Sequence, residues 1–280
     1  MKIFDDKNTL ISFLRTEGHG RTLGFVPTMG ALHDGHLSLI DIAKQQCDIV
    51  ASSIFVNPKQ FNDANDYANY PTSLDKDLEM LMDAGTDVVY VPGVNDIYPD
   101  DYIQPTPLDM GILDEVMEGK FRPGHFEGVM QVVDILLQIV APQKLFLGMK
   151  DFQQIKVLQL LTTKKHPNIE IVPCPTLRED DGLAMSSRNR RLTTAQRSQA
   201  ARVYSTLLTI KKSFPNVTPC DAIKFAKDNL NEIEGFSVDY IEIVDFYTMK
   251  PIIQWQKAGS QVACIAVKLG SVRLIDNLII

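Results

Sequence analysis

Short apolar runs alternate with longer segments of helical periodicity over the first 176 residues of the chain. The runs are nearly all apolar or small, as expected for strands that are covered on both faces. They lie at Thr22–Val26, Asp48–Val56, Asp87–Val91, Lys144–Gly148 and Ile169–Pro173. The segments before and between them predict helices at residues 8–17, 37–43, 73–84, 126–140 and 150–165. Strands that alternate with helices predict an α/β fold with a doubly wound, parallel, Rossmann-like sheet.

The pattern changes after residue 176. Predicted helices near 193–213 and 218–233 precede three strand-like runs, Val238–Val244, Gln261–Lys268 and Val272–Asp276. We therefore expect two domains, a Rossmann-like domain at 1–176 and a smaller α+β domain at 177–280. Within the first, Asn62–Asn69 has the composition of a polar, flexible connection, and Pro92–Pro107 that of a surface excursion.

Composition excludes several classes of protein. The hydrophobic fraction of 45% and the charged fraction of 22% are ordinary for a soluble globular protein of 280 residues. A net charge of -7 argues against non-specific nucleic-acid binding. No apolar run is long enough to span a bilayer, and the first residues lack the apolar core of a signal peptide. We expect a cytoplasmic protein with neither nucleic-acid nor membrane partners.

The four cysteines are widely dispersed and have no CxxC spacing; they are Cys47, Cys174, Cys220 and Cys264. This spacing predicts buried thiols in a reducing cytoplasm and neither a zinc site nor a disulfide framework.

The most informative stretch runs from Gly24 to Ile40. It predicts a strand, a glycine-containing turn and the start of a helix, which is how α/β folds present a helix N-terminus to an anion. His33 and His36 stand three apart at that helix start, so they can lie on one face. Two imidazoles beside free amide groups suit a phosphate whose charge grows during a reaction. The same spacing also fits half of a metal site, or two surface residues.

Polar residues also follow the second and fourth predicted strands. Asn57 and Gln60 come after the second strand, where ligands bind in open α/β sheets, although a turn that caps its own backbone fits equally well. After the fourth strand, Gly148 allows a close backbone approach, and Lys150, Asp151 and Gln154 mix groups suited to phosphate, hydroxyls or a metal.

Three further segments carry candidate chemistry. Residues 117–128 are dense in glycine, basic and aromatic residues, and Arg122 has a fork of donors suited to phosphate or carboxylate. Ser186, Ser187 and Arg188 lie in a glycine-containing loop that could close over a triphosphate. Asp75 and Asp77 start a helix, where they are either solvated charges or partners of a magnesium ion.

Taken in order, these segments resemble the pantothenate synthetase (pantoate–β-alanine ligase) family over nearly the whole chain. Pro27–Leu37 is similar to the HxGH signature of nucleotidylyl-transferring α/β enzymes, and Met185–Arg188 to their KMSKS-type loop. The remaining matching segments are Asn57–Phe61, Arg122–Phe126, Gly148–Gln154, Arg178–Asn189 and Arg273–Asn277. HxGH alone marks only the superfamily, whereas the ordered set is specific to the family.

The resemblance implies an AMP-forming carbon–nitrogen ligase of pantothenate biosynthesis, on the coenzyme A pathway. ATP and pantoate would give pantoyl adenylate and pyrophosphate, and β-alanine would then attack the acyl carbon to release pantothenate and AMP. The family also implies magnesium and a homodimer.

The resemblance implies a role for each matching residue. His33, His36, Lys150, Ser186, Ser187 and Arg188 would bind the ATP phosphates and act in catalysis, His36 by stabilising the transition state. Gly148 and Asp151 would approach the ribose of ATP and Met185 the adenine. Gln60, Gln154, Asn57 and Met29 would bind pantoate, with Met29 also beside ATP, and Asp77 would help to hold the magnesium ion.

Two alternatives stay open on the sequence alone. One is another small-molecule nucleotidyltransferase of the HxGH superfamily, although such an enzyme would not need both Gln60 and Gln154 near its α-phosphate. The other is a non-catalytic nucleotide sensor on the same fold, because fold alone does not fix function.

Overall fold

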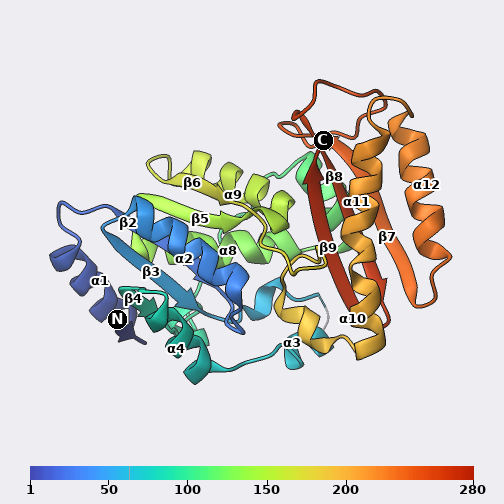
Figure 1. Cartoon of the computed structure of the whole chain (residues 1–280). Coiled ribbons are helices and arrows are strands. Elements are labelled where there is room, and N and C mark those ends of the chain that lie inside the picture. The colour runs from blue at the N-terminus through green and yellow to red at the C-terminus, as the bar shows by residue number, and fades with distance from the viewer. Residues whose placement is uncertain (63) are drawn as a thin grey trace.

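Six parallel strands form the larger of the two sheets in the computed structural model, which describes residues 1–62 and 64–280 (Figure 1). The strands are β1 (Lys2–Phe4), β2 (Leu23–Thr28), β3 (Ile49–Ile54), β4 (Val88–Tyr90), β5 (Lys144–Gly148) and β6 (Glu170–Cys174). The predicted doubly wound parallel sheet is confirmed, with β1 as an addition. This strand has three residues and pairs with β4 at the sheet edge, so it is too short to show a hydrophobic pattern.

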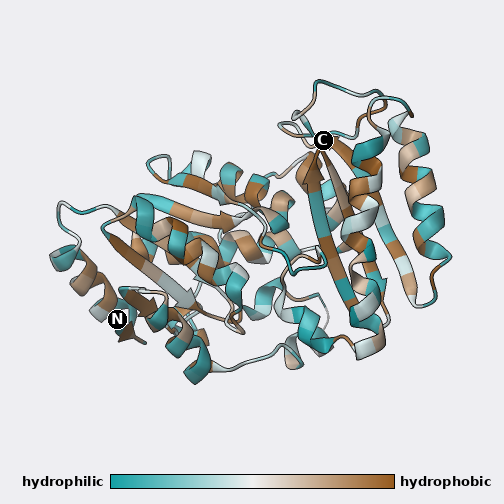
Figure 2. Cartoon of the chain, in the orientation of Figure 1, coloured by the Kyte–Doolittle hydropathy of each residue, from teal (hydrophilic) through white to brown (hydrophobic). Residues whose placement is uncertain are grey.

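Helices cover both faces of this sheet, because successive side chains of a strand point to opposite sides. On β2, Phe25 belongs to the core under α1 (Lys7–Glu17), α8 (His125–Val140) and α9 (Phe152–Lys165). The next residue, Val26, belongs to the core under α2 (Asp34–Gln46) and α4 (Leu74–Asp83). Figure 2 shows that these helices carry both hydrophilic and hydrophobic residues, as expected when one side of each helix faces the sheet.

The order of the strands creates a switch point beside β2. The order is β1-β4-β3-β2-β5-β6, so the chain adds β3 and β4 on one side of β2 and then places β5 and β6 on the other. Ligands of open α/β sheets bind outside the carboxyl ends of the strands at such a point. The segments that follow β2 and β5 carry His33, His36 and Lys150. The topology therefore brings the candidate phosphate-binding residues to one edge.

Three antiparallel strands form the smaller sheet, which lies near the C-terminus (Figure 1). They are β7 (Phe236–Asp245), β8 (Gln261–Leu269) and β9 (Val272–Ile279). One face packs against α10 (Thr194–Ala200), α11 (Arg202–Ser213) and α12 (Pro219–Asn231). The other face packs against α7 (Met117–Phe121) and the start of α9. The predicted smaller α+β part is confirmed, whereas the domain boundary at residue 176 stays a prediction.

Short helices occupy two regions that the sequence predicts to be irregular. The polar connection Asn62–Asn69 contains α3 (Ala64–Ala68), and residue 63 lies outside the described residues. The excursion Pro92–Pro107 contains α5 (Val94–Ile97), which buries Ile97. The predicted helix 193–213 is divided at Ala201 into α10 and α11. The remaining elements are α6 (Ile112–Glu115) and the 3₁₀ turns η1 (Pro58–Gln60), η2 (Met149–Asp151) and η3 (Ser187–Arg191).

The prediction that all four cysteines are buried is wrong for two of them. Cys174 and Cys264 are buried, but Cys47 is half-buried and Cys220 is exposed on α12. All four are free thiols. In the described part of the chain, no helix is long and apolar enough to cross a membrane.

Candidate active site

A pocket of about 240 Å³ opens at the carboxyl ends of β2, β3 and β5. All but one of the residues to which the family resemblance assigns a role line it. They are Met29, His33, His36, Asn57, Gln60, Gly148, Lys150, Asp151, Gln154, Met185, Ser186, Ser187 and Arg188. The exception is Asp77, which shapes the turn that leads to the two histidines.

Asp77 holds the turn between β2 and α2. Gly30 and Ala31 have positive φ angles of 79° and 51°, and this conformation directs successive amide groups toward one carboxylate. Ala31 N donates to Asp77 Oδ2 and Leu32 N to Oδ1, both at 2.8 Å. The side chain of Ser73 also donates to Oδ1, at 3.2 Å. These bonds give Asp77 a structural role: its buried carboxylate is already bound to the protein and does not line the pocket, and its contact with magnesium stays a prediction without support from these contacts.

Replacing Asp77 with alanine should destabilise the protein by about 3 kcal/mol, because two buried amide groups lose their acceptor. Urea unfolding of the purified variant measures this loss. Asp75→Ala is the matched control, since Asp75 is an exposed aspartate on the same helix and should change stability by less than about 0.5 kcal/mol. Equal effects of the two substitutions would contradict this role for Asp77.

The two histidines lie against each other at the start of α2. Their ring centroids are 4.1 Å apart, and His33 is the N-cap residue of the helix. A Cβ at Gly35, just before His36, would lie 2.9 Å from the His33 ring, so glycine at this position lets the ring keep its place. The first amide groups of α2 have no acceptor within the helix and point out of its end. The structure thus presents two imidazoles beside a helix N-terminus.

Both imidazoles are neutral near pH 7. Burial, with Lys150 and Arg190 nearby, lowers the pKa of His33 to about 4. Burial, with His33 and Lys150 nearby, also lowers the pKa of His36 well below its usual value. Nδ1 of each ring is buried and has no hydrogen-bond partner among the described residues. Neutral rings with unused nitrogens in a positively charged setting are suited to accept an anion, which would raise both pKa values.

Asn57 supports the pocket wall through hydrogen bonds within the protein. Its Oδ1 accepts from the Lys59 amide at 3.2 Å and from the Tyr98 hydroxyl at 2.9 Å. Its Nδ2 donates to Gln60 Oε1 at 3.2 Å and to the Gly128 carbonyl at 3.0 Å. The bond from the Lys59 amide supports the backbone-capping interpretation of Asn57, while its contact with pantoate stays a prediction, because Asn57 also lines the pocket. Asn57 is a positioning residue that orients the amide of Gln60, whose Nε2 lies 2.9 Å from the sulfur of Met29.

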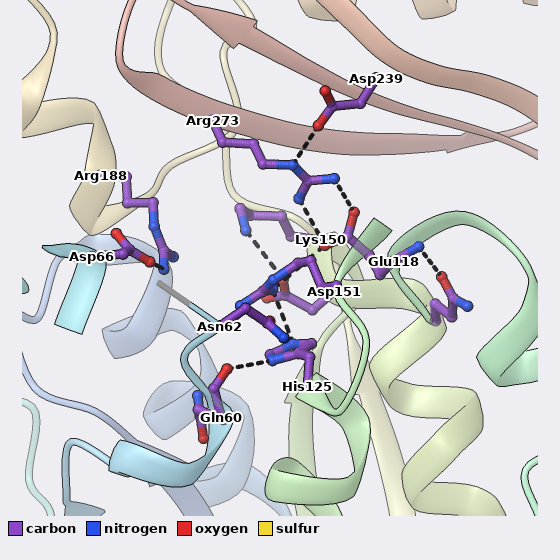
Figure 3. Close-up of polar contacts among 12 residues, drawn as sticks. Gln60, Asn62, Asp66, Glu118, His125, Lys150, Asp151, Arg188, Asp239 and Arg273 are labelled. Atoms are coloured by element: carbon purple, nitrogen blue, oxygen red, sulfur yellow. Dashed lines mark hydrogen bonds and ion pairs between the residues drawn. The ribbon is translucent and has the colours of Figure 1, made fainter. Parts of the chain in front are cut away.

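Arg122 and His125 also line the pocket. The sequence predicts that Arg122 suits a phosphate or carboxylate, but it assigns no role to His125, which Figure 3 shows beside Gln60. Nδ1 of His125 lies 2.8 Å from the Gln60 carbonyl, to which it donates. Its Nε2 then accepts from Arg122 Nη1 at 3.0 Å. Burial and the Arg122 charge lower the pKa of His125 to about 4, so the ring is neutral and keeps this arrangement. The only sequence signal for His125 is that it lies within residues 117–128, which are unusually dense in glycine, basic and aromatic residues.

Glu118, on α7, links Arg122 to the smaller sheet, and Figure 3 shows it beside Arg273. Its carboxylate pairs with both Nη atoms of Arg273 on β9, at 2.7 and 2.8 Å. It also accepts from the Tyr240 hydroxyl at 2.8 Å and lies 3.4 Å from Arg122. Arg273 in turn pairs with Asp239 at 2.7 Å. Local sequence does not single out Glu118, because its partners Tyr240 and Arg273 lie more than a hundred residues away along the chain.

The segment 186–191 closes one side of the pocket against α3. The Ser187 hydroxyl lies 3.4 Å from that of Tyr70. Arg188 and Arg191 each place a guanidinium nitrogen 2.8 Å from a carboxylate oxygen of Asp66. Figure 3 shows the pair of Arg188 and Asp66. A second cavity of about 480 Å³ continues from here toward the smaller sheet. It shares Arg122, Lys150, Asp151, Ser186 and Arg188 with the first pocket.

Comparison with known proteins identifies the family of this chain. The family model described as pantoate-beta-alanine ligase matches residues 2–279. The chain belongs to the pantoate–β-alanine ligase family. The resemblance inferred from the motifs is therefore confirmed.

Similar members cover nearly the whole chain. Pantothenate synthetase from Porphyromonas gingivalis is 43% identical over 279 residues, 99% of each chain. The protein of the same name from Phocaeicola vulgatus is 45% identical over 95% of this chain and 93% of its own. The crystal structure of pantothenate synthetase from Thermus thermophilus superposes with a TM-score of 0.93 at 37% identity, covering 99% of both chains.

A fourth relative was crystallised with small molecules. The pantoate–β-alanine ligase from Francisella tularensis is 37% identical, has a TM-score of 0.82 and covers 100% of this chain and 97% of its own. Its structure is described as a complex with β-γ ATP and β-alanine.

Proposed function

We propose that this pantoate–β-alanine ligase condenses pantoate with β-alanine at the expense of ATP. The observation that carries the proposal is the composition of one pocket in a family member. Phosphate-binding groups, His33, His36 and Lys150, share this pocket with two amide side chains, Gln60 and Gln154. The described complex of the Francisella relative with β-γ ATP and β-alanine supports the same pair of ligands here.

The reaction would proceed in two steps. A carboxylate oxygen of pantoate attacks the α-phosphorus of ATP, and the bond to pyrophosphate breaks to leave a pantoyl adenylate. The amine of β-alanine then attacks the acyl carbon, the bond to AMP breaks, and the amine gives up a proton. Adenylation supplies a good leaving group, so the enzyme acts by positioning and by stabilising charge.

The phosphates of ATP would lie at the start of α2. His33 and His36 would each donate one N–H to phosphate oxygens, with His36 stabilising the charge that develops as pyrophosphate leaves. Lys150, Ser186, Ser187 and Arg188 would bind the same phosphates, and Arg188 would exchange Asp66 for them. Gly148 and Asp151 would approach the ribose, and Met185 and Met29 would line the nucleotide side.

Pantoate would lie between β2 and the start of α9. Gln60 and Gln154 would bind its hydroxyl and carboxylate groups, and Met29 its gem-dimethyl group. The bond from Asn57 to Gln60 Oε1 leaves the Nε2 side of the Gln60 amide directed toward Met29 and the pocket.

We also propose magnesium, a homodimer and a cytoplasmic location. Magnesium would arrive on the triphosphate, since it usually keeps several water ligands and takes few from protein. Asp151 is a carboxylate of the pocket that could add one ligand. The family resemblance supports the dimer, and the cysteine pattern supports the cytoplasm.

Product analysis tests the proposed function directly. The protein, incubated with pantoate, β-alanine, ATP and magnesium, should form pantothenate and AMP in equal amounts, measured by liquid chromatography and mass spectrometry. Omitting any one substrate should abolish pantothenate. ATP binding without any product would favour a nucleotide sensor, and nucleotidyl transfer to another acceptor would favour a different HxGH transferase.

Replacing Gln154 with alanine should raise KM for pantoate about tenfold, because a hydrogen bond to a substrate is worth roughly 1.4 kcal/mol. KM for ATP should change by less than about twofold. Gln159→Ala is the control, since Gln159 lies on the same helix but outside the pocket. Equal changes in both KM values would contradict the assignment of Gln154 to pantoate.

A further inference from the structure

Asp276 and Asn277 are adjacent on β9, and both are almost fully buried, with exposed fractions of 4% and 7%. Successive residues of a strand point to opposite faces of its sheet. Leu274 belongs to the core under α10–α12, whereas Ile275 packs on the face toward α7 and α9. The alternation therefore directs Asp276 and Asn277 to different sides of the smaller sheet.

Asn277 holds the turn that carries Lys150. Its Nδ2 donates to the carbonyl of Met149 at 2.8 Å and to that of Lys150 at 2.9 Å. An amide nitrogen has two hydrogens, so both are used on η2. The position of the Lys150 backbone thus depends on a side chain from the C-terminal strand, more than a hundred residues later in the sequence.

Asp276 holds the base of the segment that carries Ser186–Arg188. It accepts from both Nη atoms of Arg178, at 2.6 and 3.0 Å. Arg178 also donates to the Gly182 carbonyl at 3.0 Å, and its guanidinium stacks on the Tyr204 ring at 3.8 Å. Through Arg178, which forms an antiparallel bridge with Ala184, the strand fixes the start of this segment.

A hydrogen bond also connects Asp276 to Asn277. Asp276 Oδ1 accepts from the Asn277 amide at 2.8 Å, so the side chain that binds Arg178 also binds the backbone of its neighbour. Neither residue lines the 240 Å³ pocket, although Asp276 lines the second cavity. The smaller sheet thus contacts both the turn that carries Lys150 and the segment that carries Ser186–Arg188, from the side away from the pocket.

We propose that Asp276 and Asn277 are positioning residues for the ATP site, a role that rests on the phosphate-binding function proposed above. They hold Lys150 and the Ser186–Arg188 segment at a fixed separation across the pocket. Phosphate-binding groups on either side can then engage one triphosphate without first being brought together. A misplacement of about 1 Å can cost roughly a hundredfold in rate, so this spacing affects both ATP binding and turnover.

Two substitutions of Asn277 test this role in pantoate-dependent exchange of pyrophosphate into ATP. Asn277→Ala should raise KM for ATP about tenfold while KM for pantoate stays within about twofold. Asn277→Asp should have an effect at least as large, because a carboxylate has nothing to donate to two carbonyl oxygens. Because aspartate has nearly the same shape as asparagine, Asn277→Asp tests the positioning role if Asn277→Ala does not fold.

Asn231→Ala is the matched control. Its side chain also makes a hydrogen bond to backbone, accepting from Val238 N at 3.3 Å, but far from the pocket. A purely structural loss would lower the folded fraction and leave both KM values unchanged. An unchanged KM for ATP in folded Asn277 variants would therefore overturn the positioning role. Absence of pantoate-dependent exchange in the parent protein would instead contradict the proposed function.

Discussion

Replacing His36 with alanine should lower the rate of adenylate formation by about two to three orders of magnitude, or 2.7–4 kcal/mol, as does loss of one donor to a developing negative charge. The reason is local. The His36 ring is neutral and buried, and its Nδ1 has no partner in the described part of the chain. It therefore has a proton to donate to phosphate without first breaking a bond within the protein. Pre-steady-state formation of pyrophosphate, measured with saturating ATP and pantoate, gives the rate.

His19→Ala is the control for this substitution. His19 is exposed and lies on the turn after α1, so its replacement should leave the rate unchanged. His36→Asn keeps a donor of similar reach and should recover part of the loss. If His36→Ala forms pyrophosphate as fast as the parent, the role assigned to His36 is wrong.

Replacing Glu118 with alanine should lower the free energy of unfolding by about 3–5 kcal/mol, the usual loss when one partner of a buried ion pair is removed. The carboxylate is 6% exposed and faces Arg273, Arg122 and the Tyr240 hydroxyl. Without it, Arg122 loses its nearest counter-charge inside the protein. Urea unfolding near pH 7 measures the effect. Asp228→Ala, which breaks an exposed pair with Lys224, is the control and should leave the midpoint unchanged.

The contribution of Glu118 should also depend on pH. Burial raises its pKa, but bonds and charge from Arg273 and Arg122 outweigh burial and hold the pKa at about 2, against 4.5 for a free glutamate. A group with a lowered pKa stabilises the protein above the unfolded value and loses that effect as pH falls. The difference between the parent and Glu118→Ala should therefore be constant above pH 4.5 and shrink toward pH 2. A difference that does not change over this range would contradict the pairing.

Local patterns predicted the parts of the site that lie within one stretch of chain. His33, Gly35 and His36 follow a strand and begin a helix, so their spacing alone predicted their arrangement. Lys150 and Ser186–Arg188 were found in the same way and line the same pocket. Local composition also identified the segment around Arg122 as unusual.

Roles that depend on distant partners could not be predicted from the sequence. From its position, Asp77 is a carboxylate at the start of a helix, yet it binds amide groups more than forty residues earlier in the chain. Glu118 and Asn277 meet their partners only after the two sheets come together. Asn57 is a further residue of this kind, because its side chain donates to the Gly128 carbonyl, 71 residues later in the chain. Periodicity describes one element at a time and has no information on such contacts.

Isotope exchange tests the central claim, that this pocket forms an acyl adenylate from pantoate. Labelled pyrophosphate is incubated with the protein, ATP and magnesium in the absence of β-alanine, with and without pantoate. We expect label to enter ATP only when pantoate is present, because only then does a reversible adenylate form. No exchange with pantoate, from protein that still binds ATP, would contradict the account.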